Sequence, residues 1–330
     1  MRNACIYLIA AFSLAPSIAA AQEAYPPISI IVGFSPGGGY DTYARVLARH
    51  YGRNLPGNPR IVVQNMPGAS SLTAVRYLDN AGKKDGSVIV AFNPGLINQS
   101  LLEYDKVKVR FPDYAWIGSI TKDYRVCYGW NAGGVRTWAD LLKRERFNLG
   151  TTAPGASAYI NHAIMKNLFG VKVHHVTGYP GSAEERLAIE RGELDGGCGA
   201  WSSNPPQWIK EKKISALVAF TKPPIPNLEG DVPFVVDLAQ TADDKTLLNV
   251  LISPDDLGRP FIASREIPAD RLAVLRKGFD ATMLDAEFLA ETQKLDLTVS
   301  PISGVDAEKM IGAIYRVPEH IIARARDIVK

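Results

Sequence analysis

The chain has 330 residues, with 37 Lys and Arg residues against 34 Asp and Glu residues and a formal net charge of +3. This near-balance argues against a broad basic surface that would bind nucleic acid or an acidic partner. The length exceeds what one compact core usually holds, so it predicts two domains.

The first 21 residues have the pattern of a secretory signal peptide. Arg2 gives a positive start, residues 6–14 are apolar, and Ala19-Ala20-Ala21 offers a small-residue cleavage site. The apolar run is shorter than the roughly 20 residues that a membrane span needs. We therefore expect cleavage after Ala21 and a soluble protein in the periplasm.

The mature chain opens on a strand, a glycine turn and a helix. Residues 28–34 are rich in β-branched side chains, and Ser35-Pro-Gly-Gly-Gly-Tyr-Asp41 follows them. An apolar stripe at helical spacing comes next, with Asp41 as the expected N-cap. Such a turn aims free backbone N–H groups at one point and favours an anion. A plain strand-to-helix turn is an equal alternative.

Strands and helices then alternate along the chain. In the first part, strands are expected near 61–63, 88–92 and 116–120, with a helix at 72–78. The pattern restarts with strands near 147–149, 173–176, 194–200 and 214–220 and helices at 135–143, 158–168 and 183–191. Alternation of this kind predicts parallel sheets with helices on both faces.

A Pro-rich stretch at 222–233 is typical of a return crossing between domains. We therefore expect a discontinuous first domain, residues 22–120 with 222–330, and a second domain of residues 121–221. Helices are expected in the tail, the last of them at 319–329.

Cys127 and Cys198 are the only cysteines after the predicted cleavage site, and both fall in expected strands. In an oxidising compartment they could form a disulfide. Two buried thiols packing as small apolar groups fit equally well.

Three further loops share the chemistry of the first glycine turn. They span residues 64–71, 150–157 and 177–182, and each follows a strand and precedes a helix. Open α/β sheets bind ligands at the carboxyl ends of their strands. Two loops from each domain can therefore face one another across a cleft and offer backbone N–H groups and hydroxyls.

Taken together, these segments resemble the Bug family, the extracytoplasmic solute receptors of the tripartite tricarboxylate transporters. The segments that carry the resemblance are Ile31–Asp41 with Ala44-Arg45, Val63–Ala69, Lys84-Asp85-Gly86, Pro154–Ser157, Gly178–Gly181 and Gly192–Asp195. They occur in family order from residue 26 to about residue 220.

The resemblance implies a type II periplasmic-binding-protein fold, with two Rossmann-like α/β domains joined by two crossovers and a ligand cleft between them. It also implies that loop amides and hydroxyls bind a small organic carboxylate and that the receptor, a monomer, delivers it to the permease subunits. The residues implied at the ligand are Ser35, Gly38, Gly39, Asp41, Asn65, Gly68 and Ala69 from the first domain, and Thr151, Ala153, Gly155, Ser157, Tyr179 and Asp195 from the second.

Other classes of function are less well supported by the sequence. It has no G-x-S-x-G elbow, no phosphate loop, no G-x-G-x-x-G motif and no metal-ligand spacing. We therefore expect no enzymatic activity, no cofactor and no metal. A periplasmic sensor that presents the bound carboxylate to a signalling partner is the alternative function. The sequence leaves the identity of the carboxylate open.

Overall fold

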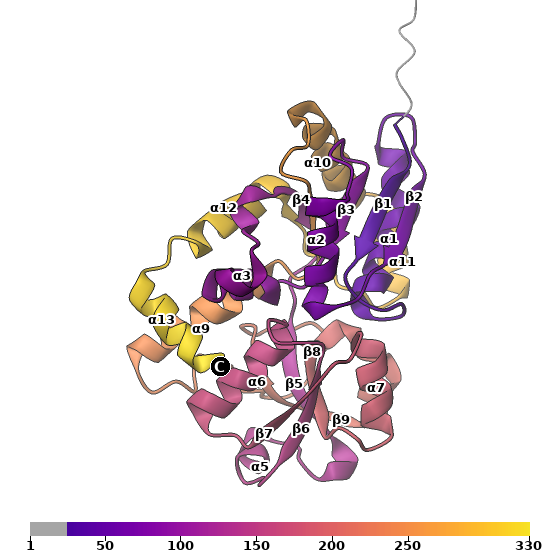
Figure 1. Cartoon of the computed structure of the whole chain (residues 1–330). Coiled ribbons are helices and arrows are strands. Elements are labelled where there is room, and N and C mark those ends of the chain that lie inside the picture. Colours follow the sequence, from indigo (N-terminus) through magenta and orange to yellow (C-terminus); the bar gives the residue numbers. More distant parts are fainter. Residues whose placement is uncertain (1–24) are drawn as a thin grey trace, which may run out of the picture.

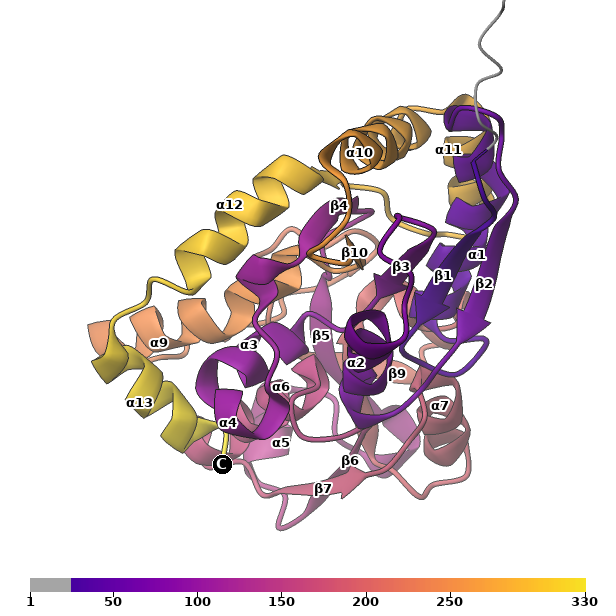
Figure 2. The ribbon, with the colours of Figure 1, turned by 45° about the horizontal axis from the view of Figure 1, so that its top comes forward.

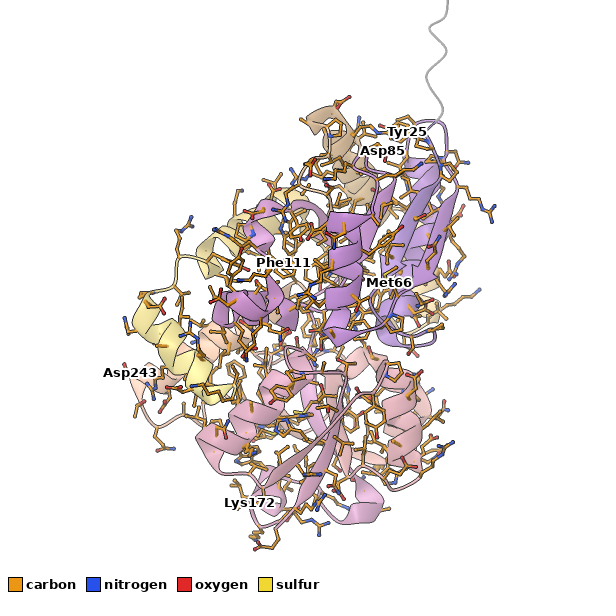
Figure 3. All side chains as sticks on the ribbon, in the orientation of Figure 1. Tyr25, Met66, Asp85, Phe111, Lys172 and Asp243 are labelled. Atoms are coloured by element: carbon orange, nitrogen blue, oxygen red, sulfur yellow. A yellow bond between two sulfur atoms is a disulfide. The ribbon has the colours of Figure 1, made fainter. Side chains whose placement is uncertain are left out.

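A computed structural model describes residues 25–330, and they form two α/β domains, each built on one sheet (Figure 1). The predicted signal peptide and its cleavage site lie outside the described residues. Tyr25 and Asp85 mark the far end of the first domain and Lys172 the far end of the second (Figure 3). Met66, directly after a strand, lies on the side of the first domain that faces the second.

The first sheet has six strands and mixed direction. Their spatial order is β11 (Ile302–Ser303), β4 (Ala115–Ser119), β10 (Pro260–Ala263), β3 (Val88–Ala91), β1 (Ile28–Val32) and β2 (Ile61–Asn65). β1 runs parallel to β2 and β3, whereas β10 is antiparallel to β3 and β4.

Helices cover both faces of this sheet, because alternate side chains of its buried strands point to opposite faces. One face carries α1 (Gly39–Tyr51), α10 (Ala269–Met283) and α11 (Ala286–Lys294). The other carries α2 (Leu72–Asn80), α3 (Gly95–Leu102) and α12 (Gly304–Ile314), with the short α4 (Tyr104–Val107) after α3. The view in Figure 2 shows α10 and α12 on the outside of the first domain.

The second sheet has five strands. Their order is β7 (Val173–Thr177), β6 (Phe147–Thr151), β8 (Gly196–Ala200), β5 (Arg125–Trp130) and β9 (Ile214–Ala219). β6 is parallel to β7 and β8, and β5 is antiparallel to β8 and β9. The helices beside this sheet are α5 (Trp138–Leu142), α6 (Ser157–Phe169), α7 (Ser182–Glu190) and α8 (Pro206–Lys210).

Two helices from the last third of the chain also lie against the second domain. Apolar side chains of α9 (Ala242–Ile252) and α13 (Glu319–Ile328) join the core that contains Phe147 and Leu149 of β6. Figures 1 and 2 show α9 and α13 side by side at the flank of the molecule. The expected boundaries at residues 120 and 222 stay a prediction.

The two-domain α/β fold expected from the sequence is confirmed, but the expectation of parallel sheets is wrong, since both sheets contain antiparallel pairs. β5 is the first strand after the chain crosses to the second sheet, and β10 is the first after it returns. Neither strand follows a helix packed on its own sheet, so the rule that gives parallel strands does not apply to it. Both strands therefore begin at the edge where the parallel strands end.

Cys127 and Cys198 form a disulfide between the directly opposed positions of β5 and β8. The structure thus decides between the two alternatives that the sequence left open. Among residues 25–330, no helix is both long enough and apolar enough to span a bilayer.

Candidate functional site

Loops from the two domains touch along the line where the sheets face one another. The Ser35 hydroxyl donates to Glu184 Oε2 at 2.8 Å, and Arg186 Nη2 donates to the Gly37 carbonyl at 3.1 Å. On the other side, the hydroxyls of Ser70 and Thr152 lie 2.9 Å apart. These contacts close the two domains over the space between them.

That space is a cavity of about 80 Å³. Its lining from the first domain includes Phe34, Gly38, Gly39, Tyr40, Asn93 and Arg259. Its lining from the crossing segment and the second domain includes Asp123, Arg125, Thr151, Ser182, Glu185 and Ser203. Both sheets therefore supply polar groups to one small volume.

Two buried arginines dominate the electrostatics of the cavity. The side chains of Arg125 and Arg259 are only 5% and 3% exposed. Arg125 Nη1 lies 2.5 Å from Asp123 Oδ2, and Arg259 Nη1 lies 3.3 Å from Asp123 Oδ1. Burial disfavours the charged form of Arg125, but Asp123 and Asp255 outweigh burial and hold its pKa above the usual value. Both guanidinium groups are therefore cations at any physiological pH.

Several polar atoms at the cavity have no hydrogen-bond partner within residues 25–330. They are the Tyr40 hydroxyl, the Thr151 hydroxyl and Arg259 Nε, which can donate, and Asp123 Oδ1, which accepts. Burial raises the pKa of Tyr40, so its hydroxyl keeps its proton and can donate. Buried donors normally find a partner, and together these three donors and the two arginines suit an anionic oxygen.

The first glycine turn brings the start of α1 against the second domain. Gly39 has no room for a side chain, because a Cβ there would lie 2.4 Å from Ser203 Oγ and 3.1 Å from Arg259 Nη2. Gly38 is the N-cap of α1, so the residues that follow it carry the first backbone N–H groups of the helix. These groups have no partner within the helix and are exposed at the cavity. This close approach explains the glycine pair.

Asp41 is not the N-cap that the sequence predicted, because α1 begins two residues earlier, at Gly39. Its carboxylate instead accepts from the Gly37 N–H, from Asn65 Nδ2 and from Arg45 Nε, each at 2.9 Å. Burial works to raise the pKa of Asp41, but these hydrogen bonds outweigh burial and lower it. Asp41 and Asn65 thus stabilise the conformation of the glycine turn.

The predicted ligand residues divide into those that line the cavity and those that do not. Gly38, Gly39 and Thr151 line it. The others lie in the surrounding loops or farther away: Ser35, Asp41, Asn65, Gly68, Ala69, Ala153, Gly155, Ser157, Tyr179 and Asp195. Contact of any of the thirteen with a ligand stays a prediction.

Several residues outside the lining make contacts that place the loops. Ser157 Oγ lies 2.6 Å from Asp255 Oδ1, and the Ser157 N–H donates to Asn93 Oδ1 across the domains at 3.0 Å. The Ala153 carbonyl accepts from Ser70 Oγ at 3.2 Å. These contacts hold the second-domain loop against the first domain.

Four other residues serve the loops or a distant strand pair. Gly68 and Ala69 have positive φ in the turn that leads to Ser70. A Cβ at Gly155 would collide with Gln99. Asp195 accepts from the Asn148 N–H at 2.6 Å, so it fixes β8 beside β6.

The sequence reasoning missed Arg125, Arg259 and Glu185. The two arginines stand at or directly before the starts of β5 and β10. In a parallel sheet, strand starts lie at the edge opposite the ligand loops. The sequence therefore did not place these positions near those loops. The signal that would have found them is the double crossing, which makes β5 and β10 antiparallel.

No family model matches the chain. A UPF0065 protein of Agrobacterium vitis, from the TAR-I ttuE-ttuC' intergenic region, is 24% identical over 323 residues, covering 91% of this chain and 92% of that protein. A UPF0065 protein of Bordetella pertussis is 26% identical over 174 residues, covering 51% and 53%.

Among solved structures, the periplasmic binding protein BugD superposes with a TM-score of 0.71 at 18% identity, covering 92% of this chain and 96% of BugD. This chain has the fold of a Bug receptor. The fold that the resemblance to the Bug family implies is thereby confirmed.

Two structures from Rhodopseudomonas palustris match equally well. MatC with bound malate gives a TM-score of 0.70 at 17% identity, covering 92% of this chain and 99% of MatC. A second protein with adipate gives 0.73 at 18% identity, covering 92% and 97%.

Proposed function

We propose that this chain is a periplasmic solute-binding receptor. It captures a small organic carboxylate by closing its two domains and delivers it to the membrane permease of a tripartite tricarboxylate-type transporter. Export follows from the predicted signal peptide, with cleavage after Ala21. The receptor acts as a monomer and performs no chemistry on its ligand.

One observation carries the proposal: the cavity between the domains is lined by two buried arginines and by donors that no other residue among 25–330 satisfies. Charge-assisted hydrogen bonds from guanidinium to carboxylate are strong and specific in geometry. The structures with malate and adipate share this fold, which supports a carboxylate as the class of ligand.

Closure of the two domains distinguishes the loaded receptor from the empty one. The contacts of Ser35 with Glu184 and of Ser70 with Thr152 join the domains on two sides of the cavity. A ligand that touches both domains stabilises this closed form over an open one. The permease then has a surface that differs between the empty and the loaded receptor.

A thermal-unfolding titration tests the proposal. The protein is first freed of carried-over ligand by unfolding, dialysis and refolding. A panel of small carboxylates is then added at increasing concentration. We expect at least one of them to raise the melting temperature progressively, since a ligand that binds only the folded state stabilises it. A flat response across the panel would contradict the proposal.

A further inference from the structure

The two arginines of the cavity lie close to carboxylates of the protein. Asp123 lies within ion-pair distance of both Arg125 and Arg259, and Asp255 Oδ2 lies 3.7 Å from Arg125 Nε. Only Asp123 of these two carboxylates lines the cavity, and burial raises the pKa of Asp255 to about 7. A ligand with two uncompensated negative charges would therefore leave net negative charge away from water, which is costly.

A third carboxyl group lines the same cavity. Glu185 of α7 is partly buried, and its carboxylate has neither a hydrogen bond nor an ion pair among residues 25–330. Burial raises the pKa of Glu185 to about 7, against the opposing effect of Arg125 and Arg186. A cationic group placed beside Glu185 would supply the partner that the protein does not.

The volume of the cavity limits the size of the ligand. An engineered apolar cavity of about 150 Å³ binds benzene. The cavity here holds about 80 Å³ in the closed arrangement of the domains. It therefore suits a ligand of few non-hydrogen atoms.

We propose that the ligand is a small zwitterion, a short amino carboxylate such as an α-amino acid with a small side chain. Its carboxylate binds the donors of Arg259, Tyr40 and Thr151, and its ammonium group binds Glu185. This inference rests on the proposed function and names the class of carboxylate. With Glu185 ionised beside the ammonium group, Asp123 and Glu185 balance the charges of the two arginines, and the bound zwitterion adds no net charge.

The test compares ligands of matched size that differ only in charge. Ligand-free protein is titrated by calorimetry at neutral pH with glycine and alanine, with acetate and propionate, and with malonate. The same titrations are run on Glu185→Gln. Glu193→Gln is the matched control, since Glu193 lies exposed on the same domain and does not line the cavity.

We expect a zwitterion to bind at least about tenfold more tightly than its monoanionic counterpart, the gain typical of one charge-assisted hydrogen bond. Glu185→Gln should abolish that preference, and Glu193→Gln should preserve it. If Glu185→Gln does not fold, the comparison of ligands in the wild-type protein still decides.

Two outcomes contradict the inference and are distinct. If acetate, propionate or malonate binds as tightly as the zwitterions, the ligand is a plain carboxylate; the proposed function then stands and the inference is wrong. If neither a carboxylate nor an amino carboxylate binds, the proposed function is itself wrong.

Discussion

At the scale of single residues, the cavity is lined by polar groups, and some of them lack a hydrogen-bond partner within the described residues. Arg125 and Arg259 are held by Asp123, yet Arg259 Nε and the hydroxyls of Tyr40 and Thr151 have no partner within residues 25–330. Leaving a buried donor unpaired costs free energy. Under the proposed function, such groups contribute to binding a ligand more than to folding, and substitutions can separate the two effects.

Thr151→Val removes a hydroxyl and keeps the shape of the side chain. We expect ligand affinity to fall about tenfold, the typical cost of a lost hydrogen bond to a charged group. The melting temperature of the ligand-free protein should hardly change, because the hydroxyl bonds to nothing in the described protein. Thr282→Val is the control: its hydroxyl donates to the Gly278 carbonyl at 2.7 Å, so its loss should destabilise without weakening binding. Equal affinities of Thr151→Val and wild type would remove Thr151 from the site.

His162 predicts a pH dependence of stability. It is fully buried on α6, its ring centroid lies 5.5 Å from that of His175, and burial lowers its pKa well below the usual value. The unfolded chain therefore binds a proton below about pH 6.5 that the folded protein does not. The stability that neutral His162 provides is complete above that pH and is lost as the pH falls.

For one such group, the free energy of unfolding should drop by about 1.4 kcal/mol between pH 7.5 and 5.5. Burial raises the pKa values of Glu185 and Asp255, so these groups change stability in the opposite sense and variants must isolate the histidine. Urea unfolding at both pH values should show a smaller drop for His162→Asn than for wild type. Exposed His320→Asn should match wild type. The same drop in all three proteins would exclude His162 as its source.

At the scale of elements, the start of α1 is where the domains approach most closely. The strand–turn–helix at residues 28–51 was predictable from its β-branched run, its glycines and its apolar stripe. The exact start of α1 was not, since Asp41 satisfies the rules for an N-cap equally well. Tertiary packing decides where α1 starts, because Gly39 must lie close to Ser203 and Arg259.

Gly39→Ala should therefore hinder closure. The added Cβ would overlap Ser203 Oγ, so we expect ligand affinity to fall by at least about tenfold, with a small loss of stability. Adding Ser203→Gly to Gly39→Ala removes the obstacle and should restore part of the affinity. Gly133→Ala is the control, because a Cβ there meets no atom within 4 Å. Unchanged affinity in Gly39→Ala, measured by calorimetry, would show that closure does not depend on this approach.

A disulfide links the neighbouring strands β5 and β8. It joins Cys127 to Cys198, 71 residues apart in sequence. Loop-closure entropy predicts a stabilisation of about 4 kcal/mol for a loop of that length. Urea unfolding of Cys127→Ser/Cys198→Ser should therefore give a markedly lower free energy than wild type. A difference below about 1 kcal/mol would indicate that the unfolded chain is not constrained by this link.

At the scale of the whole molecule, the sequence predicts the two-domain fold well and the site only in part. The alternation of strands and helices, and loop motifs such as Pro154–Ser157, indicated the architecture and the edge of each sheet that meets the cavity. The arginines escaped prediction because their position depends on the direction of β5 and β10. That direction is set by how the chain crosses between domains and leaves no trace in local periodicity. Glu185 lies inside an ordinary amphipathic helix, so only the folded structure brings it to the cavity.

Calorimetric titration of ligand-free wild-type protein and Arg259→Gln with small carboxylates, zwitterionic ones included, tests the central claim most directly. Exposed Arg265→Gln, whose ion pairs lie at the surface, serves as the control. The account predicts binding of at least one carboxylate to wild type and to Arg265→Gln, with a loss of at least about tenfold in Arg259→Gln. Equal affinity in all three proteins, or no binding of any carboxylate to wild type, would contradict it.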